Sequence, residues 1–244
     1  MVKLSERLLA VTDLITPCDV VADVGCDHGY TSIYILQNKL AKRVIATDVN
    51  EGPLKKAAQN VKIYGCADRV DLRLSNGLEK YEPGEVQCIV ISGMGGNLMV
   101  DILERGNDVA KKAQQLILQP QSDIARVRHY LKDNGYNIVS ESFIKEDGKF
   151  YPMMKAVRGE MNWDKEIFFI YGKVLLREEN PVLHEFLIYE RDYYVNLYRD
   201  LACADNTQSV RNRLREVETA LKYNDEALSM ISERNQLALE QILN

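Results

Sequence analysis

The sequence has no long apolar run, no paired cysteine spacing and no overall excess of basic charge. None of its 244 residues lies in a stretch near the roughly 18 consecutive apolar residues of a membrane-spanning helix, so no membrane segment is expected. Its five cysteines lack the spacing of a disulfide framework or a zinc site, which fits a reducing cytoplasm. The net charge of −5 argues against a surface built as a whole for nucleic acid.

The acidic surplus is confined to the C-terminal third. From residue 160 onward there are 10 Lys and Arg against 16 Asp and Glu, a net of −6, which leaves +1 for residues 1–159. Apolar residues make up 46% of the whole chain. The chain starts with a predicted amphipathic helix and not a secretory leader, because Leu4, Leu8 and Val11 share one helical face. Its short basic groups either contact phosphates or belong to solvated helix faces.

The most informative stretch is DVVADVGCDHGY, residues 19–30. A short apolar strand runs directly into a glycine-containing turn, and helical periodicity begins at Thr31. Glycines let such a turn approach a ligand closely, and the helix N-terminus offers free N–H groups and a partial positive charge. The pattern is common, so it indicates a ligand site only together with other residues.

A second residue strengthens this interpretation. Asp48 ends the next strand, 23 residues after Gly25, where an acid accepts hydrogen bonds from a ribose diol, or alternatively caps the following helix. The turn itself carries Asp27 between its glycines, and this carboxylate would repel a pyrophosphate. S-adenosyl-L-methionine has no phosphate and carries positive charge, so the turn favours that cofactor over NAD.

Strand and helix alternate along most of the first 158 residues. Apolar patterns predict strands at 20–24, 43–48, 70–74, 86–92, 116–119, 136–144 and 150–158. Helical patterns fall at 31–38, 53–64, 124–134 and after the glycines at 93–96. The last two strands are too close for a parallel crossover and should be antiparallel. The sequence thus predicts an α/β fold of the class I methyltransferase arrangement: a Rossmann-like, mostly parallel seven-stranded sheet with helices on both faces.

The pattern changes at about Met161. Residues 162–179 and 181–204 read as helices, and from Val210 two rows seven residues apart form a coiled-coil seam. The rows are Val210, Val217, Asn224, Ile231 and Ala238, and Leu214, Leu221, Leu228, Asn235 and Ile242. We expect an antiparallel pair with the 181–204 helix through Val182, Phe186, Tyr189 and Tyr193; a parallel dimer is the alternative, so the protein is a monomer or a coiled-coil-mediated dimer. The predicted domains are 1–160, for cofactor and catalysis, and 161–244, a helical coiled coil that either holds RNA or dimerises.

Six motifs in this order resemble one known family. They are DVGCDHGY (23–30), ATDVNEGPL (46–54), RLSNGLE (73–79), ISGMGG (91–96), LILQPQ (116–121) and EDGKFYPM (146–153). Together with the heptad tail, they are similar to the bacterial TrmK family of S-adenosylmethionine-dependent tRNA (adenine-N1)-methyltransferases. The resemblance implies transfer of a methyl group to the adenosine at position twenty-two of tRNA, with S-adenosyl-L-homocysteine as product, in the cytoplasm.

The resemblance also implies a set of cofactor-binding residues. Around the methionine part it places Asp23, Gly25, Cys26, Asp27, His28, Gly29 and Tyr30. Around the ribose and adenine it places Asp48, Val49, Asn76, Gly77 and Leu78, and beside the transferred methyl group Ser92, Gly93 and Met94. Arg7 reaches a phosphate or the cofactor carboxylate, or is a surface arginine. Cys26 has no base partner and is expected to be a packed small residue.

The turn at 92–96 bears on the chemistry. Methyltransferases acting on an exocyclic amine usually carry an Asn/Asp-Pro-Pro-aromatic turn here, and this sequence has Ser-Gly-Met-Gly-Gly. Adenine N1 has a free lone pair and needs alignment, not a base. Asp27 is the candidate for stabilising the cationic product, or it orients the cofactor or caps the helix. Met94, Tyr30 or Tyr151 could stack on an extruded base.

Two other functions stay open on the sequence alone. A small-molecule methyltransferase would suit the acidic balance better than an RNA enzyme does. A non-catalytic cofactor-binding module could use the coiled coil to recruit a partner.

Overall fold

The computed structural model describes the backbone of residues 1–243 and the side chains of residues 1–231. The chain divides into two compact units, Met1–Asn162 and a helical unit that begins at Trp163. The heptad positions Asn235, Ala238 and Ile242 lie outside the residues whose side chains are described.

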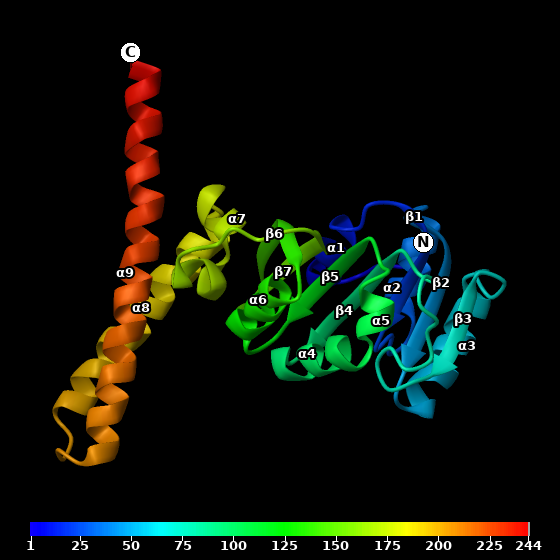
Figure 1. Ribbon diagram of the computed structural model, residues 1–244, viewed down its shortest axis with the longest axis horizontal. Coiled ribbons are helices and arrows are strands. Elements are labelled where there is room, and N and C mark those ends of the chain that lie inside the picture. The colour runs from blue at the N-terminus through cyan, green and yellow to red at the C-terminus, as the bar shows by residue number, and fades with distance from the viewer. Residues whose placement is uncertain (244) are drawn as a thin grey trace. The chain divides into compact units, whose positions relative to one another are not determined.

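The first unit is built on one seven-stranded sheet (Figure 1). The strand order is β3-β2-β1-β4-β5-β7-β6. Its strands are β1 (Cys18–Val24), β2 (Ala41–Asp48), β3 (Val70–Leu74), β4 (Cys88–Met94), β5 (Gln115–Pro120), β6 (Tyr136–Glu146) and β7 (Lys149–Arg158). The pairs β1–β2, β2–β3, β1–β4 and β4–β5 are parallel, and β7 runs antiparallel to both β5 and β6. This is the sheet that the sequence predicts.

Six helices cover the sheet. They are α1 (Glu6–Asp13), α2 (Tyr30–Gln37), α3 (Glu51–Ile63), α4 (Gly96–Arg105), α5 (Asn107–Ala110) and α6 (Ile124–Asp133). The strand order reverses at β1, and right-handed crossovers then place α2 and α3 on one face and α4 to α6 on the other. The central strands are accordingly buried on both sides, and every residue of β5 is buried.

The topology brings three loops to one edge of the sheet. The parallel strands β1, β2 and β4 are neighbours, so the segments after them, 25–29, 49–50 and 95, share the carboxyl edge. The order reverses between β1 and β4, which is the position where open α/β sheets bind ligands. The fold alone therefore predicts a ligand site at the carboxyl ends of β1, β2 and β4.

The helix predicted for residues 162–179 is wrong in its first part. Residues 161–165 have no regular secondary structure, and the helical segment that follows contains the π-helix η1 (Phe168–Gly172) before α7 (Lys173–Arg177). The cause is a cluster of aromatic side chains in which the ring of Trp163 lies 5.4 Å from that of Phe169. Gly172, with φ of 97°, allows the change of geometry between η1 and α7.

The second unit continues as a helical hairpin of α8 (Pro181–Ala202) and α9 (Gln208–Leu243). The antiparallel pairing is confirmed because the contacts run in opposite directions along the two helices: Nδ2 of Asn224 donates to the carbonyl of Leu187 at 2.9 Å, whereas the hydroxyl of Tyr198, later in α8, donates to Glu218, earlier in α9, at 3.5 Å. Asn224 is fully buried in the seam, where an amide restricts the register of the two helices.

Of the seam residues predicted for α8, Val182 and Phe186 are half-buried, and the prediction is wrong for Tyr189 and Tyr193. Tyr189 and Tyr193 are 63% and 52% exposed, while Leu183 and Leu187 are buried. The heptad of α8 is displaced by one residue from the predicted row, because the large tyrosines resemble seam residues by hydrophobicity but leave their hydroxyl groups in water. On α9, Val217, Asn224 and Ile231 of the predicted row are buried as expected.

No helix within the described residues has the length and apolar character to cross a membrane. All five cysteines are free thiols, and only Cys203 is exposed.

Candidate active site

The turn between β1 and α2 is a left-handed loop attached to β2. Gly25, Asp27 and Gly29 have φ angles of 76°, 49° and 74°. The N–H of Gly25 donates to the carbonyl of Thr47 at 2.8 Å, which fixes the start of the turn. Gly25 is required for space as well, because a Cβ there would lie 2.3 Å from Cε of Met94. The side chain of Met94 therefore reaches over the glycine turn, and these two predicted site residues meet.

Asp48 joins the end of β2 to this turn. Its Oδ2 accepts a hydrogen bond from the N–H of Asp27 at 3.3 Å, and its Oδ1 accepts one from the N–H of Asn50 at 2.9 Å. The second bond supports the start of α3, to which the side chain of Asn50 contributes no capping bond. The carboxylate remains partly exposed beside Val49, which is 61% exposed. Asp48 is thus positioned at a surface where a ribose and a purine could lie.

Asp23 lies in the wall of the same pocket as a buried carboxyl group. It is 5% exposed, and its Oδ2 accepts a hydrogen bond from Oγ of Ser32 at 2.5 Å. Burial raises the pKa of Asp23 to about 6; the charge of Asp48 adds to this rise, and the bond from Ser32 opposes it. At neutral pH the group carries its charge at a cost in stability, and a cationic ligand would relieve that cost.

We expect the substitution Asp23→Asn to stabilise the ligand-free protein at neutral pH. The pKa of Asp23 is raised in the folded state, so ionisation destabilises the fold as pH rises from about 4 to about 6. The gain at about pH 7.5 should be roughly 2–3 kcal/mol, since each pKa unit corresponds to about 1.4 kcal/mol, and it should vanish at about pH 4. Melting temperatures of both proteins at the two pH values test this. An equal gain in melting temperature at the two pH values, or no gain at the higher pH, contradicts this prediction.

Arg7 of α1 reaches the ends of β4 and β5. Its Nη1 donates to Oε1 of Gln119 at 2.8 Å and to Oγ of Ser92 at 3.2 Å. The guanidinium lies over the ring of Tyr151, 5.5 Å from the centroid. Gly93, with φ of 78°, has a backbone conformation that favours glycine, and a Cβ there would only touch Nη1 at 3.5 Å. Arg7 is therefore a cation held in a defined position.

These groups line one pocket of about 150 Å³. Its walls comprise Arg7, Leu8, Asp23, Val24, Gly25, Cys26, Asp27, His28, Tyr30, Thr31 and Ser92. The pocket combines carboxyl groups from β1 and its turn with a guanidinium from α1. That combination suits a zwitterion, whose ammonium group would lie near the carboxylates and whose carboxylate would meet Arg7.

Two of the predicted residues have their side chains in the core. Cys26 is 6% exposed, and burial, the largest cause, together with nearby carboxylates raises the pKa of its thiol, so it is an uncharged packing group as expected. Leu78 is 2% exposed and packs against Gly106. A ligand can therefore reach these two residues mainly through their backbone. Asn76, in the loop after β3, is exposed.

The rim of the turn is polar and aromatic. The carboxylate of Asp27 is 70% exposed and lies 3.6 Å from Nε2 of His28. The ring of His28 is 6.1 Å from that of Tyr30, which is 40% exposed. Gly77, with φ of 62°, closes the segment after β3 against α4.

Sequence reasoning assigned no site role to four residues that the structure places in or beside the pocket: Leu8, Val24, Thr31 and Gln119. Leu8 and Thr31 are ordinary helix residues and carry no signal. Gln119 does carry one, because it is a polar side chain at the carboxyl end of an otherwise apolar strand, next to β4.

Comparison with known proteins places this site in a family. A profile described as "Methyltransferase domain" matches residues 4–154. The tRNA (adenine(22)-N(1))-methyltransferase of Bacillus subtilis is 31% identical over 220 residues, which cover 88% of this chain and 92% of that protein. The chain belongs to the tRNA (adenine(22)-N1)-methyltransferase family.

Solved structures of the family share the fold over nearly the whole chain. The Bacillus subtilis m1A22 tRNA methyltransferase TrmK has a TM-score of 0.85 at 30% identity, covering 93% of this chain and 100% of that one. The complex of M. capricolum TrmK with S-adenosyl-homocysteine has a TM-score of 0.82 at 25% identity, covering 93% of this chain and 99% of that one. The resemblance drawn from the six motifs and the predicted fold class are thereby confirmed.

Proposed function

We propose that this protein transfers the methyl group of S-adenosyl-L-methionine to N1 of an adenosine in tRNA, adenosine 22 by its family. The observation that carries the proposal is the pocket at the switch point of the sheet, which joins Asp23, Asp27 and Arg7 beside the glycine turn. The related TrmK proteins described above, one of them bound to S-adenosyl-homocysteine, support the choice of cofactor and substrate.

The residues present fit this cofactor from end to end. S-adenosyl-L-methionine supplies a methyl group on a positively charged sulfur. Arg7 would hold its carboxylate, and Asp23 would face its cationic groups. The pocket is smaller than the roughly 300 Å³ of a typical ligand site, so it suits the amino-acid end. The adenosine would lie outside it, with its ribose on Asp48 and its base along the exposed Val49.

The turn after β4 favours a ring nitrogen as the acceptor. It contains no carboxylate or proline, and its Ser92 and Gly93 are hydrogen-bonded to Gln119 at 3.3 and 3.0 Å. A polarising acceptor for an exocyclic amine would have to come from this turn. With Gly93, Gly95 and Gly96 there instead, a flat base can approach the methyl group closely, which is what an already available lone pair requires.

The transfer needs no base to remove a proton. The N1 lone pair bonds to the methyl carbon as the carbon–sulfur bond breaks, both electrons of that bond remain on sulfur, and the positive charge passes to the adenine ring. The protein has to align the three atoms and stabilise the moved charge. We assign the second task to Asp27, whose carboxylate lies at the rim beside His28, and contact with the base to Met94, whose side chain reaches Gly25.

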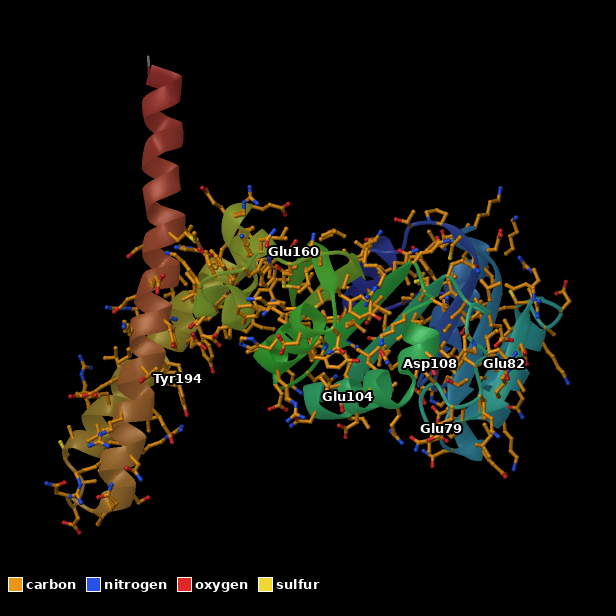
Figure 2. All side chains as sticks on the ribbon, viewed as in Figure 1. Glu79, Glu82, Glu104, Asp108, Glu160 and Tyr194 are labelled. Carbon is orange, nitrogen blue, oxygen red and sulfur yellow. The ribbon has the colours of Figure 1, made fainter. Side chains whose placement is uncertain are left out.

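Charge limits where RNA can approach the first unit. Glu79, paired with Arg105 at 3.4 Å, lies with Glu104 and Asp108 around α4 and α5 (Figure 2). Arg105 and the exposed Lys111 and Lys112 offset part of this negative charge, so we expect the RNA backbone to be guided mainly by the glycine turn, where the acceptor base must reach the methyl group. A paired adenosine must also leave its helix before N1 becomes accessible.

The proposal is tested by incubating the protein with unmodified tRNA and labelled S-adenosyl-L-methionine, followed by nucleoside analysis. We expect N1-methyladenosine at position 22. Label in N6-methyladenosine, or transfer to small molecules but not to tRNA, would contradict the proposal; the second result would favour a small-molecule methyltransferase.

A further inference from the structure

Gln119 is a buried amide with an unusual set of partners. It is fully buried at the end of β5. Its Oε1 accepts from Nη1 of Arg7 at 2.8 Å, from the N–H of Gly93 at 3.0 Å and from Oγ of Ser92 at 3.3 Å. Its Nε2 donates to the carbonyl of Pro120 at 3.1 Å. Three donors on one oxygen fix the orientation of the amide, because the opposite orientation would place an NH2 group against them.

These bonds leave one edge of Arg7 available. The two protons of Nη1 are directed at Gln119 and Ser92. Within the described part of the chain, Nε and Nη2 of Arg7 make no hydrogen bond, and the guanidinium has no carboxylate partner within ion-pair distance. Nε–H and Nη2–H form the side of a guanidinium that binds a carboxylate through two parallel hydrogen bonds. The ring of Tyr151 holds the plane of this fork.

The neutrality of Gln119 matters as much as its position. A glutamate has nearly the same shape, but its carboxylate would neutralise Arg7 and repel a second carboxylate nearby. The amide accepts the hydrogen bond and leaves the guanidinium its full charge. Gln119 also accepts hydrogen bonds from Ser92 and Gly93. One side chain therefore fixes the position of both the Arg7 guanidinium and the segment beside the acceptor base.

We infer that Gln119 is a positioning residue that aims the charged fork of Arg7 at the α-carboxylate of the bound cofactor. The pair thereby makes the site selective for adenosyl ligands that retain this carboxylate over decarboxylated ones. This inference rests on the proposed function, since it takes the ligand of the pocket to be S-adenosyl-L-methionine or its product.

The test compares two ligands by calorimetry: S-adenosyl-L-homocysteine and its decarboxylated analogue, 5′-deoxy-5′-(3-aminopropylthio)adenosine. The wild type should prefer the first by at least about tenfold, the change that 1.4 kcal/mol produces. Gln119→Glu should weaken S-adenosyl-L-homocysteine by at least about tenfold and the analogue by less than about threefold, so that the preference disappears. Gln114→Glu, which adds the same charge at an exposed position before the opposite end of β5, should leave the preference intact.

Further variants separate positioning from folding. Arg7→Met should abolish the same preference, and adding Gln119→Glu to it should have little further effect, because the two act on one interaction. If Gln119→Glu does not melt cooperatively, Gln119→Met replaces it with the same expected loss of preference. Equal weakening of both ligands by a Gln119 variant, or an unchanged preference, overturns the inference. A wild type that binds neither ligand contradicts the proposed function instead.

Discussion

Replacing Asp48 with alanine is expected to weaken binding of S-adenosyl-L-methionine by about two orders of magnitude. A ribose diol can donate two hydrogen bonds to this carboxylate, and a hydrogen bond to a charged group contributes about 1.5–3 kcal/mol. The substitution also removes the acceptor for the N–H groups of Asp27 and Asn50, so the turn loses its attachment to β2. Cofactor affinity by calorimetry and tRNA methylation at saturating tRNA should fall together.

A matched variant controls for the loss of charge. Asp19→Ala removes a carboxylate near the other end of β1, where it pairs with Lys42 at the surface. It should leave the affinity within about twofold, as expected for a surface ion pair. If Asp48→Ala keeps the affinity of the wild type, the ribose is not bound here. If methylation falls while the affinity stays, Asp48 acts on a later step than cofactor binding.

The second large effect concerns stability. Nε and Nη2 of Arg128 in α6 donate to Oε1 of Glu141 in β6 at 3.0 and 2.8 Å. Their side chains are 1% and 0% exposed, so the pair is enclosed between helix and sheet. Arg128→Met leaves the Glu141 carboxylate without its cation and should lower the free energy of unfolding by about 3–5 kcal/mol. Urea denaturation of the two proteins measures the difference.

The double variant Arg128→Met, Glu141→Leu distinguishes an uncompensated charge from a simple loss of packing. Two apolar side chains of similar volume often replace a buried ion pair without net cost, so the double variant should recover most of the lost stability. A double variant as unstable as Arg128→Met alone would show that packing, and not the buried charge, causes the effect. Neither residue lines the cofactor pocket, so cofactor affinity should be unchanged in the folded fraction.

The sequence predicts most of the sheet because its signals are local. The central strands are apolar runs, β3 and β6 alternate apolar and polar residues, and the spacing of Gly25 and Asp48 reflects one β-α-β unit. The error at residues 162–165 arises from a specific ring contact that apolar periodicity does not reveal, since Trp163 packs on Phe169 six positions later. The seam of α8 was displaced for a similar reason: only the partner helix decides which of two adjacent rows is covered.

The residues of the candidate site also fall into two groups, those that a local motif predicts and those that only the folded chain brings together. Residues of the glycine turn and Asp48 follow from one motif and its spacing. Gln119 could not be found so directly, because its function depends on Arg7, 112 positions earlier in the chain, and on the turn after β4. Leu78 illustrates the opposite case: it lies in a motif, but its side chain packs against Gly106 and only its backbone faces outward.

The central claim is that the crevice at the ends of β1, β2 and β4 holds the cofactor. A crystal structure of the protein with S-adenosyl-L-homocysteine tests it most directly. We expect the carboxylate of the ligand on Nε and Nη2 of Arg7, its ribose on Asp48, and its sulfur beside the glycine turn. A ligand bound elsewhere on the molecule, or crystals that take up none at saturating concentration, would contradict the account.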